Sequence, residues 1–75
     1  MTQDRIDKTR DKMRRGGLPP ATREGPSTRA GLGHRCDGCD EMIDLAETQY
    51  DVTVAGVVSL RFHDVCYTTW ANFRR

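Results

Sequence analysis

Apolar and polar residues alternate most regularly between residues 49 and 62. The runs QYDVTV and VVSLRF each place alternate apolar side chains on one face, as a strand with one buried face does. These side chains are Tyr50, Val52 and Val54 in the first run and Val58, Leu60 and Phe62 in the second. Because Ala55 and Gly56 form a turn signal between the runs, we predict a β-hairpin.

After the hairpin the apolar residues change to a helical period. In HDVCYTTWANFRR, residues 63–75, Cys66, Trp70 and Phe73 recur at i, i+4 and i+7 and form one stripe of a helix. The run EMIDLAET before the hairpin supplies three more candidate core residues. They are Met42, Ile43 and Leu45. We expect Tyr50, Phe62, Trp70 and Phe73 to pack in the core, with Tyr67 off the stripe and exposed.

Residues 1–34 lack such a pattern. The charged stretch at the start pairs opposite charges at helical spacing, but its only apolar members are Ile6 and Met13, so a helix there has no face to bury. The stretch that follows is rich in glycine and holds all three prolines, which oppose regular structure. We therefore predict a flexible N-terminal arm over residues 1–34 and a folded module over residues 35–75.

The net charge of +1 hides an opposition between the two halves of the chain. Nine basic and four acidic residues give residues 1–35 a charge of +5, whereas three arginines and seven acids give residues 36–75 a charge of −4. A basic arm can bind phosphate, so nucleic acid is one candidate partner. The acids within the arm favour the plainer interpretation of a solvating tail. The candidate residues for a nucleic-acid contact are Arg10, Lys12, Arg14 and Arg15.

Three cysteines and one histidine follow the spacing of metal ligands. Cys36-x2-Cys39 and His63-x2-Cys66 supply four soft or borderline donors in two pairs. Structural zinc sites use tetrahedral sets of thiolate and imidazole ligands in such pairs. The first pair, with Gly38 between its members, would form a zinc knuckle, and the second would join the hairpin to the helix. We predict one structural Zn²⁺ held by these four residues.

Other functions of these three cysteines and the histidine fit the surrounding sequence less well than a structural zinc site does. A redox dithiol at Cys36 and Cys39 needs a thioredoxin-like βαβ pattern, which does not surround it. Three unrelated buried thiols would not explain the spacing. A catalytic zinc needs an open coordination position. Four protein ligands close the coordination shell, so we expect no enzymatic activity. His34, two residues before Cys36, is an alternative ligand, although a solvated arm residue is the simpler interpretation.

The run CDGC … LRFHDVCYTTW resembles the first zinc module of LIM domains, where C-x-x-C is also paired with H-x-x-C after a hairpin. It is similar as well to the zinc fingers of poly(ADP-ribose) polymerases, and both resemblances imply a treble-clef-like zinc architecture. This sequence departs from LIM domains in having no second set of four ligands, and from the DNA-binding polymerase fingers in its acidic module.

Most of the chain also resembles small bacterial zinc-binding proteins of uncharacterised function. The resemblance lies in Gly17-Leu18-Pro19, in Gly31 and Gly33 before the C-x-x-C, and in LRFH-x-x-C-x-x-x-W. It implies a zinc-binding domain and attaches no activity to it.

These observations predict a small α+β zinc-stapled domain made of a knuckle, a β-hairpin and a C-terminal helix, preceded by a disordered arm. We expect a non-enzymatic module that is a monomer in isolation and binds another protein, with nucleic-acid binding through the arm as the alternative. We expect no small-molecule substrate. No apolar run reaches the roughly 18 residues of a membrane span, and no secretory signal is present, so we expect a cytoplasmic protein with no membrane contact.

Overall fold

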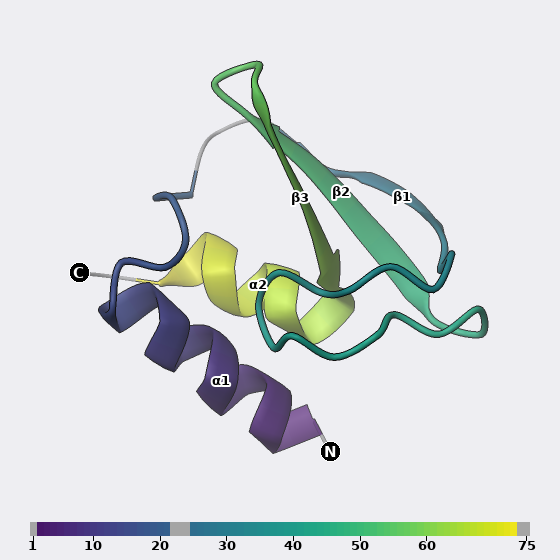
Figure 1. Cartoon of the computed structure of the whole chain (residues 1–75), viewed down its shortest axis with the longest axis horizontal. Coiled ribbons are helices and arrows are strands. Elements are labelled where there is room, and N and C mark those ends of the chain that lie inside the picture. The colour runs from purple at the N-terminus through teal and green to yellow at the C-terminus, as the bar shows by residue number, and fades with distance from the viewer. Residues whose placement is uncertain (1, 22–24, 74–75) are drawn as a thin grey trace.

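Two helices and three strands make up the protein in a computed structural model that describes residues 2–21 and 25–73. Helix α1 (Thr2–Arg14) comes first, strands β1 (Ser27–Ala30), β2 (Thr48–Val54) and β3 (Val58–His63) follow, and helix α2 (Asp64–Asn72) comes last. The strands rise above the two helices in Figure 1. This is a small α+β fold, in agreement with the expected class. Neither helix in the described part of the chain is long and apolar enough to cross a membrane.

The predicted hairpin is present. Strands β2 and β3 pair antiparallel, with Tyr50 opposite Phe62. At the turn, Ala55 and Gly56 adopt φ angles of 55° and 72°, which is the left-handed conformation that the tightest hairpin turns require at both central positions. The predicted apolar residues of the two strands therefore share one face of the sheet.

Strand β1 is a third strand that the sequence did not predict. It lies within the expected arm and pairs antiparallel with β2, so that Ser27 is opposite Asp51 and Ala30 is opposite Thr48. All four of its side chains are exposed, so the strand leaves no alternating apolar signal. Backbone pairing to β2 holds it, together with an ion pair of 2.7 Å between Arg29 Nε and Asp51 Oδ2.

The core lies between α2 and one face of the sheet, and aromatic rings fill much of it. Phe62 and Trp70 stack with their ring centroids 5.2 Å apart. Tyr50 and Tyr67 stack at the same separation, so Tyr67 joins the ring cluster although it was expected outside it. Phe73 packs against this core from the end of α2. The last two residues of the predicted C-terminal helix, 74 and 75, lie outside the described residues.

Of the three apolar residues that the run EMIDLAET was expected to place in the core, only Ile43 lies there. Ile43 is fully buried, whereas Met42 and Leu45 are 67% and 70% exposed. The loop folds as a narrow antiparallel ribbon, in which Ile43 N donates to His34 O at 2.8 Å and Met42 bridges to Arg35. Successive side chains of an extended ribbon point to opposite sides, so Met42, the neighbour of the buried Ile43, faces solvent. Leu45 lies in the turn that follows the ribbon.

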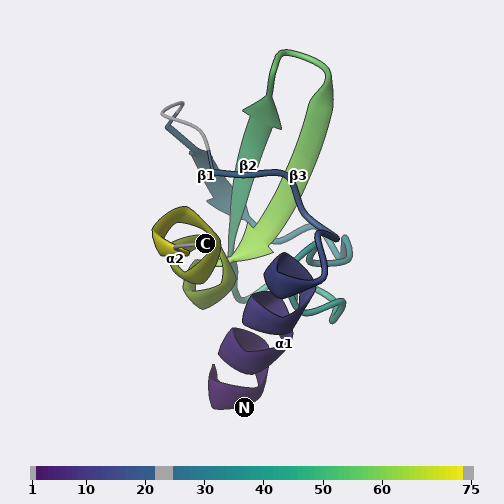
Figure 2. The same cartoon turned by 90° about the vertical axis from the view of Figure 1, so that its left-hand side faces the viewer.

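Residues 2–21 form a docked helix and a connecting segment, which differs from the flexible arm that the sequence predicted. Helix α1 packs beside α2, as Figures 1 and 2 show from two sides. Thr9 and Met13 of α1 are buried, and so is Leu18 in the connecting segment. The indole Nε1 of Trp70 donates to the carbonyl oxygen of Pro19 at 2.8 Å, which joins this segment to the core.

The buried face of α1 is narrow and partly polar, which explains why an apolar stripe did not reveal it. Its central member is Thr9, whose hydroxyl donates to the carbonyl oxygen of Arg5 at 2.8 Å and is therefore satisfied inside the protein. Met13 lies one turn further along the same face. Ion pairs from Arg5, Lys8 and Lys12 also join α1 to the acidic module.

A truncation in α1 tests whether the helix is docked. Met13→Ala removes a buried side chain and should lower the free energy of unfolding by about 2–4 kcal/mol, measured by urea denaturation of the metal-loaded protein. The neighbouring change Arg14→Ala is the control, because Arg14 is exposed and its truncation should cost no more than about 0.5 kcal/mol. If the two changes are equally harmless, α1 is not docked and this helix belongs to a flexible arm.

Candidate metal centre

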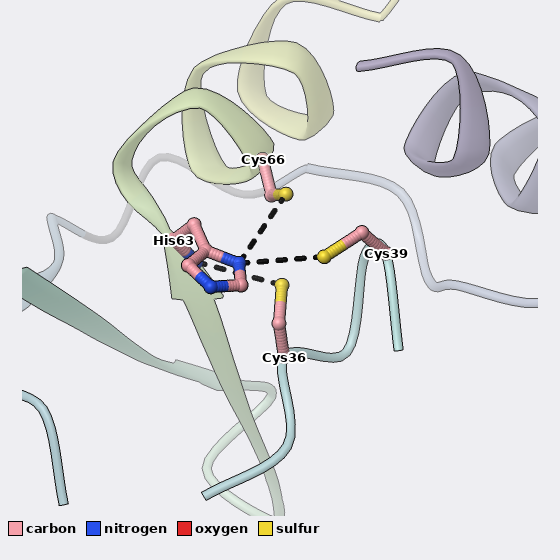
Figure 3. Close-up of side chains that lie close together, drawn as sticks. All are labelled: Cys36, Cys39, His63 and Cys66. Atoms are coloured by element: carbon pink, nitrogen blue, oxygen red, sulfur yellow. Dashed lines mark hydrogen bonds between the residues drawn. The ribbon is translucent and has the colours of Figure 1, made fainter. Parts of the chain in front are cut away.

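The four predicted ligands lie together around one buried point (Figure 3). Cys36 and Cys39 come from the loop before the hairpin, His63 is the last residue of β3, and Cys66 lies in the first turn of α2. Their donor atoms all lie within 4.8 Å of one another. None of the four residues is more than 2% exposed. The cluster is therefore positioned to bind one metal ion.

The imidazole of His63 is turned so that Nδ1 faces the sulfurs. Nδ1 lies 3.3 Å from Cys39 Sγ and 3.9 Å from Cys66 Sγ, while Nε2 lies 3.1 Å from the carbonyl oxygen of Met42. Because a carbonyl can only accept, Nε2 carries the hydrogen of the neutral ring and Nδ1 keeps its lone pair. Histidine ligands of metals are held in the same way, by a partner on the second ring nitrogen.

The change from strand to helix places the second pair of ligands. His63 ends β3 and is also the N-cap of α2, with extended φ and ψ angles of −67° and 161°. Cys66 follows three residues later, which on a helix returns its side chain to the side of the N-cap. The H-x-x-C spacing thus brings both donors to the same point.

Hydrogen bonds at the knuckle favour a thiolate at Cys36. Its Sγ atom accepts from the backbone N–H groups of Gly38 at 3.4 Å and His63 at 3.5 Å. The pKa of Cys36 is lowered, mainly by a hydrogen bond from the Cys66 thiol, whose own pKa is raised. Burial raises the pKa of the Cys39 thiol. The protein alone therefore stabilises one thiolate, and loading the site with a divalent cation must release the remaining thiol protons.

The absence of a side chain at Gly38 lets α1 pass directly over the knuckle. A Cβ atom at this position would lie 2.6 Å from Thr9 Oγ1 and 3.0 Å from Cys66 Cβ. The carbonyl oxygen of Arg5, which accepts from Thr9, also lies 4.0 Å from Cys66 Sγ. One turn of α1 thus covers the metal-binding cluster and belongs to the centre.

Two lysines of α1 bind the acidic loop that carries the knuckle. Lys12 Nζ donates to the carbonyl oxygen of Asp37 at 2.9 Å and pairs with the Asp40 carboxylate. Lys8 Nζ lies 3.4 Å from Glu41 Oε2. An isolated exposed ion pair contributes little to stability. These pairs lie at a single interface between α1 and the acidic loop, where their contributions add. The opposite charges of the two halves of the chain are therefore partly satisfied within the molecule.

Arg5 connects α1 to the ligand His63 through Glu47. Arg5 Nη1 lies 2.8 Å from Glu47 Oε2, and Glu47 Oε1 lies 3.5 Å from His63 Nε2. The hydrogen bond from Arg5 lowers the pKa of the Glu47 carboxyl, and the same bond raises the pKa of the guanidinium. A carboxylate near the imidazole N–H helps to hold the orientation of the ring. Arg5, Thr9 and Glu47 were not among the predicted site residues. The opposition of charge between the two halves of the chain is a signal for Arg5 and Glu47, and Thr9 leaves none.

The four basic residues predicted to contact nucleic acid do not act as one group. Lys12 binds the acidic loop, and Arg15 Nε lies 3.2 Å from Asp11 Oδ2. Within residues 2–21 and 25–73, the side chains of Arg10 and Arg14 have no hydrogen-bond or ion-pair partner. Nucleic-acid binding stays a prediction. His34, the alternative metal ligand, is exposed and lies outside the cluster of four donors.

The donor set defines the class of site as a buried centre of three sulfurs and one imidazole nitrogen. A comparison of the chain with known protein families, with curated proteins and with solved structures finds no match. The resemblance to LIM domains, to polymerase zinc fingers and to small bacterial proteins therefore remains one of motifs.

A methyl group at Gly38 tests the contact between α1 and the knuckle. Gly38→Ala forces a Cβ atom against Thr9 and Cys66, and we expect the free energy of unfolding of the metal-loaded protein to fall by about 1–3 kcal/mol. Gly25→Ala is the control, since a Cβ atom there meets nothing within 4 Å. An equal effect of both changes on thermal or urea unfolding would contradict the close approach of α1.

Proposed function

We propose that the chain is a structural zinc module, in which the metal organises the fold and the surface binds another protein. The observation that supports zinc most directly is the buried set of three sulfurs and one nitrogen, with Nδ1 of His63 directed at the sulfurs by the bond from Nε2 to Met42. Thiolate and imidazole donors together select borderline-soft ions, and this donor set is typical of structural zinc.

The size of the cluster supports a tetrahedral ion. Bonds of about 2.3 Å to sulfur and about 2.0 Å to nitrogen keep the donors of one tetrahedron about 3.5–4 Å apart. The donor atoms here lie within 4.8 Å of one another, so small side-chain rotations bring all four to a single ion. Four protein donors complete the coordination shell and leave no position for a substrate, which supports a non-enzymatic role.

The order of the ligand-bearing elements supports a treble-clef-like assignment. A knuckle supplies Cys36 and Cys39, a hairpin ends at His63, and the helix that follows supplies Cys66. This is the order that the resemblance to LIM modules and polymerase fingers implies. We propose that zinc takes the place of a large apolar core, which a domain of this size lacks.

A buried structural ion cannot contact other molecules. We therefore assign the proposed binding of a partner to the protein surface. The loop that the metal would hold in place exposes several large apolar side chains, which favours a protein partner. These side chains are Leu32, Met42 and Leu45, exposed by 54%, 67% and 70%.

Metal removal tests the structural role. We expect elemental analysis to find one zinc per purified chain, and we expect a chelator to collapse the dispersion of the amide NMR signals from residues 36–73. The reason is that the binding energy of structural zinc, about 10–16 kcal/mol in small peptides, is also folding energy. An unchanged spectrum from protein that is demonstrably free of metal would refute the proposal.

Ligand substitutions test the donor set. Cys36→Ser and Cys66→Ser should each abolish the zinc content and unfold the module, because each leaves three donors around the ion. The matched control is His34→Ala, which removes an exposed imidazole from the same loop. It should leave the zinc content and the amide spectrum unchanged. A damaging His34→Ala change would mean that the ligand set is assigned wrongly.

A further inference from the structure

We propose that the groove between α1 and α2 binds an acidic peptide segment that carries an apolar anchor residue. The groove has a volume of about 470 Å³. Its lining includes Ile6, Arg10 and Arg14 on one side and Thr68, Asn72 and Phe73 on the other. The inference rests on the proposed function and gives it a surface and a class of partner.

Arg10 and Arg14 are the basic residues of α1 that the rest of the described protein does not use. The other basic side chains near them are engaged with carboxylates or carbonyls of the protein itself, namely Arg5, Lys8, Lys12 and Arg15. Arg10 and Arg14 are exposed and lack any such partner within residues 2–21 and 25–73. One helical turn separates them, about 6 Å along the axis. Each guanidinium can therefore bind a separate carboxylate in bidentate fashion.

The wall formed by α2 offers hydrogen-bond acceptors. The hydroxyls of Thr68 and Thr69 donate to the carbonyl oxygens of Asp64 and Val65, at 3.1 and 2.8 Å. Asn72 Nδ2 donates to the carbonyl oxygen of Thr68 at 2.9 Å. The hydroxyl lone pairs and Asn72 Oδ1 keep their capacity to accept. A peptide backbone brings N–H donors to such a wall, whereas the sugar–phosphate backbone of DNA brings only acceptors.

The apolar part of the groove comes from Ile6 and Phe73, both of which are half-buried. An apolar side chain placed between them would remove their remaining surface from water, which is favourable. Three carboxylates on α1 act against a long polyanion. They are Asp4, Asp7 and Asp11. Two separate guanidinium groups beside an apolar floor thus fit single acidic residues around an anchor better than a continuous run of phosphates.

Three fluorescein-labelled twelve-residue peptides test the class of partner. All three carry the same leucine and phenylalanine anchors among uncharged serine residues, and they differ only at two positions beside the anchors, which are both glutamate, both glutamine or both lysine. With the metal-loaded full chain, fluorescence anisotropy should show that the glutamate peptide binds at least about tenfold more tightly than the glutamine peptide, because only carboxylates form charge-assisted bonds to arginine. The lysine peptide should not bind. Equal affinity for the glutamate and glutamine peptides would overturn the proposal.

A pair of double variants tests the surface. Arg10→Gln with Arg14→Gln should weaken binding of the glutamate peptide about tenfold and remove its advantage over the glutamine peptide. Arg35→Gln with Arg61→Gln removes the same charge from residues that do not line the groove, and it should leave the affinity unchanged. An equal loss in both double variants would show attraction by net charge, which also overturns the proposal. Amide spectra verify that both variants stay folded.

Single-stranded and duplex oligonucleotides represent the competing class of partner. If they bind through Arg10 and Arg14 while the glutamate peptide does not, the groove is a nucleic-acid site and the peptide proposal is wrong. Failure here is distinguishable from failure of the proposed function. A zinc-loaded, folded chain that ignores every peptide refutes this groove alone, whereas a chain that folds without metal refutes the structural zinc module.

Discussion

The convergence of three sulfurs and one imidazole nitrogen is the constraint on which the rest of the structure depends. The donors come from a loop, the end of β3 and the start of α2, so a single point ties together three separate segments of the chain. The protein by itself favours a thiolate at only one of the three cysteines. A hydrogen bond from Cys66 lowers the pKa of Cys36 and raises that of Cys66, and burial raises the pKa of Cys39. A divalent cation at this point would supply the missing charge and close the fold around it.

The position of α1 follows from this centre. The helix covers the knuckle because Gly38 has no side chain, and its buried residues Thr9 and Met13 together with its polar contacts to the acidic loop hold it there. The chain from Arg5 through Glu47 to His63 means that the helix also helps to orient a ligand. The basic N-terminal residues and the acidic module, which looked like two separate surfaces in the sequence, thus partly neutralise each other. Arg10 and Arg14 take no part in this internal pairing within the described residues, and both line the groove between the helices. They are therefore available to bind a ligand there.

The elements that could be predicted from sequence are those with a local signal. The alternation of apolar and polar residues from Tyr50 to Phe62 predicts the hairpin. The four metal donors can be predicted because they form two pairs, each with two residues between its members. Strand β1 has no such signal, since its side chains are all exposed and only its backbone pairs with β2. Helix α1 has no apolar stripe because its buried face centres on Thr9. The ion pairs that join it to the acidic module connect residues 28 to 42 positions apart in the chain. Such contacts depend on the tertiary fold and leave only a balance of charge in the sequence.

Hydrogen exchange of the backbone amides, measured with and without bound metal, tests most directly whether the metal centre organises the whole chain. If α1, the knuckle, the end of β3 and the start of α2 form one unit around the ion, amides in all four segments are protected in the metal-loaded protein and lose their protection together when the metal is removed. Protection of α1 that survives metal removal would contradict this account. So would an α1 that exchanges freely while the metal is bound.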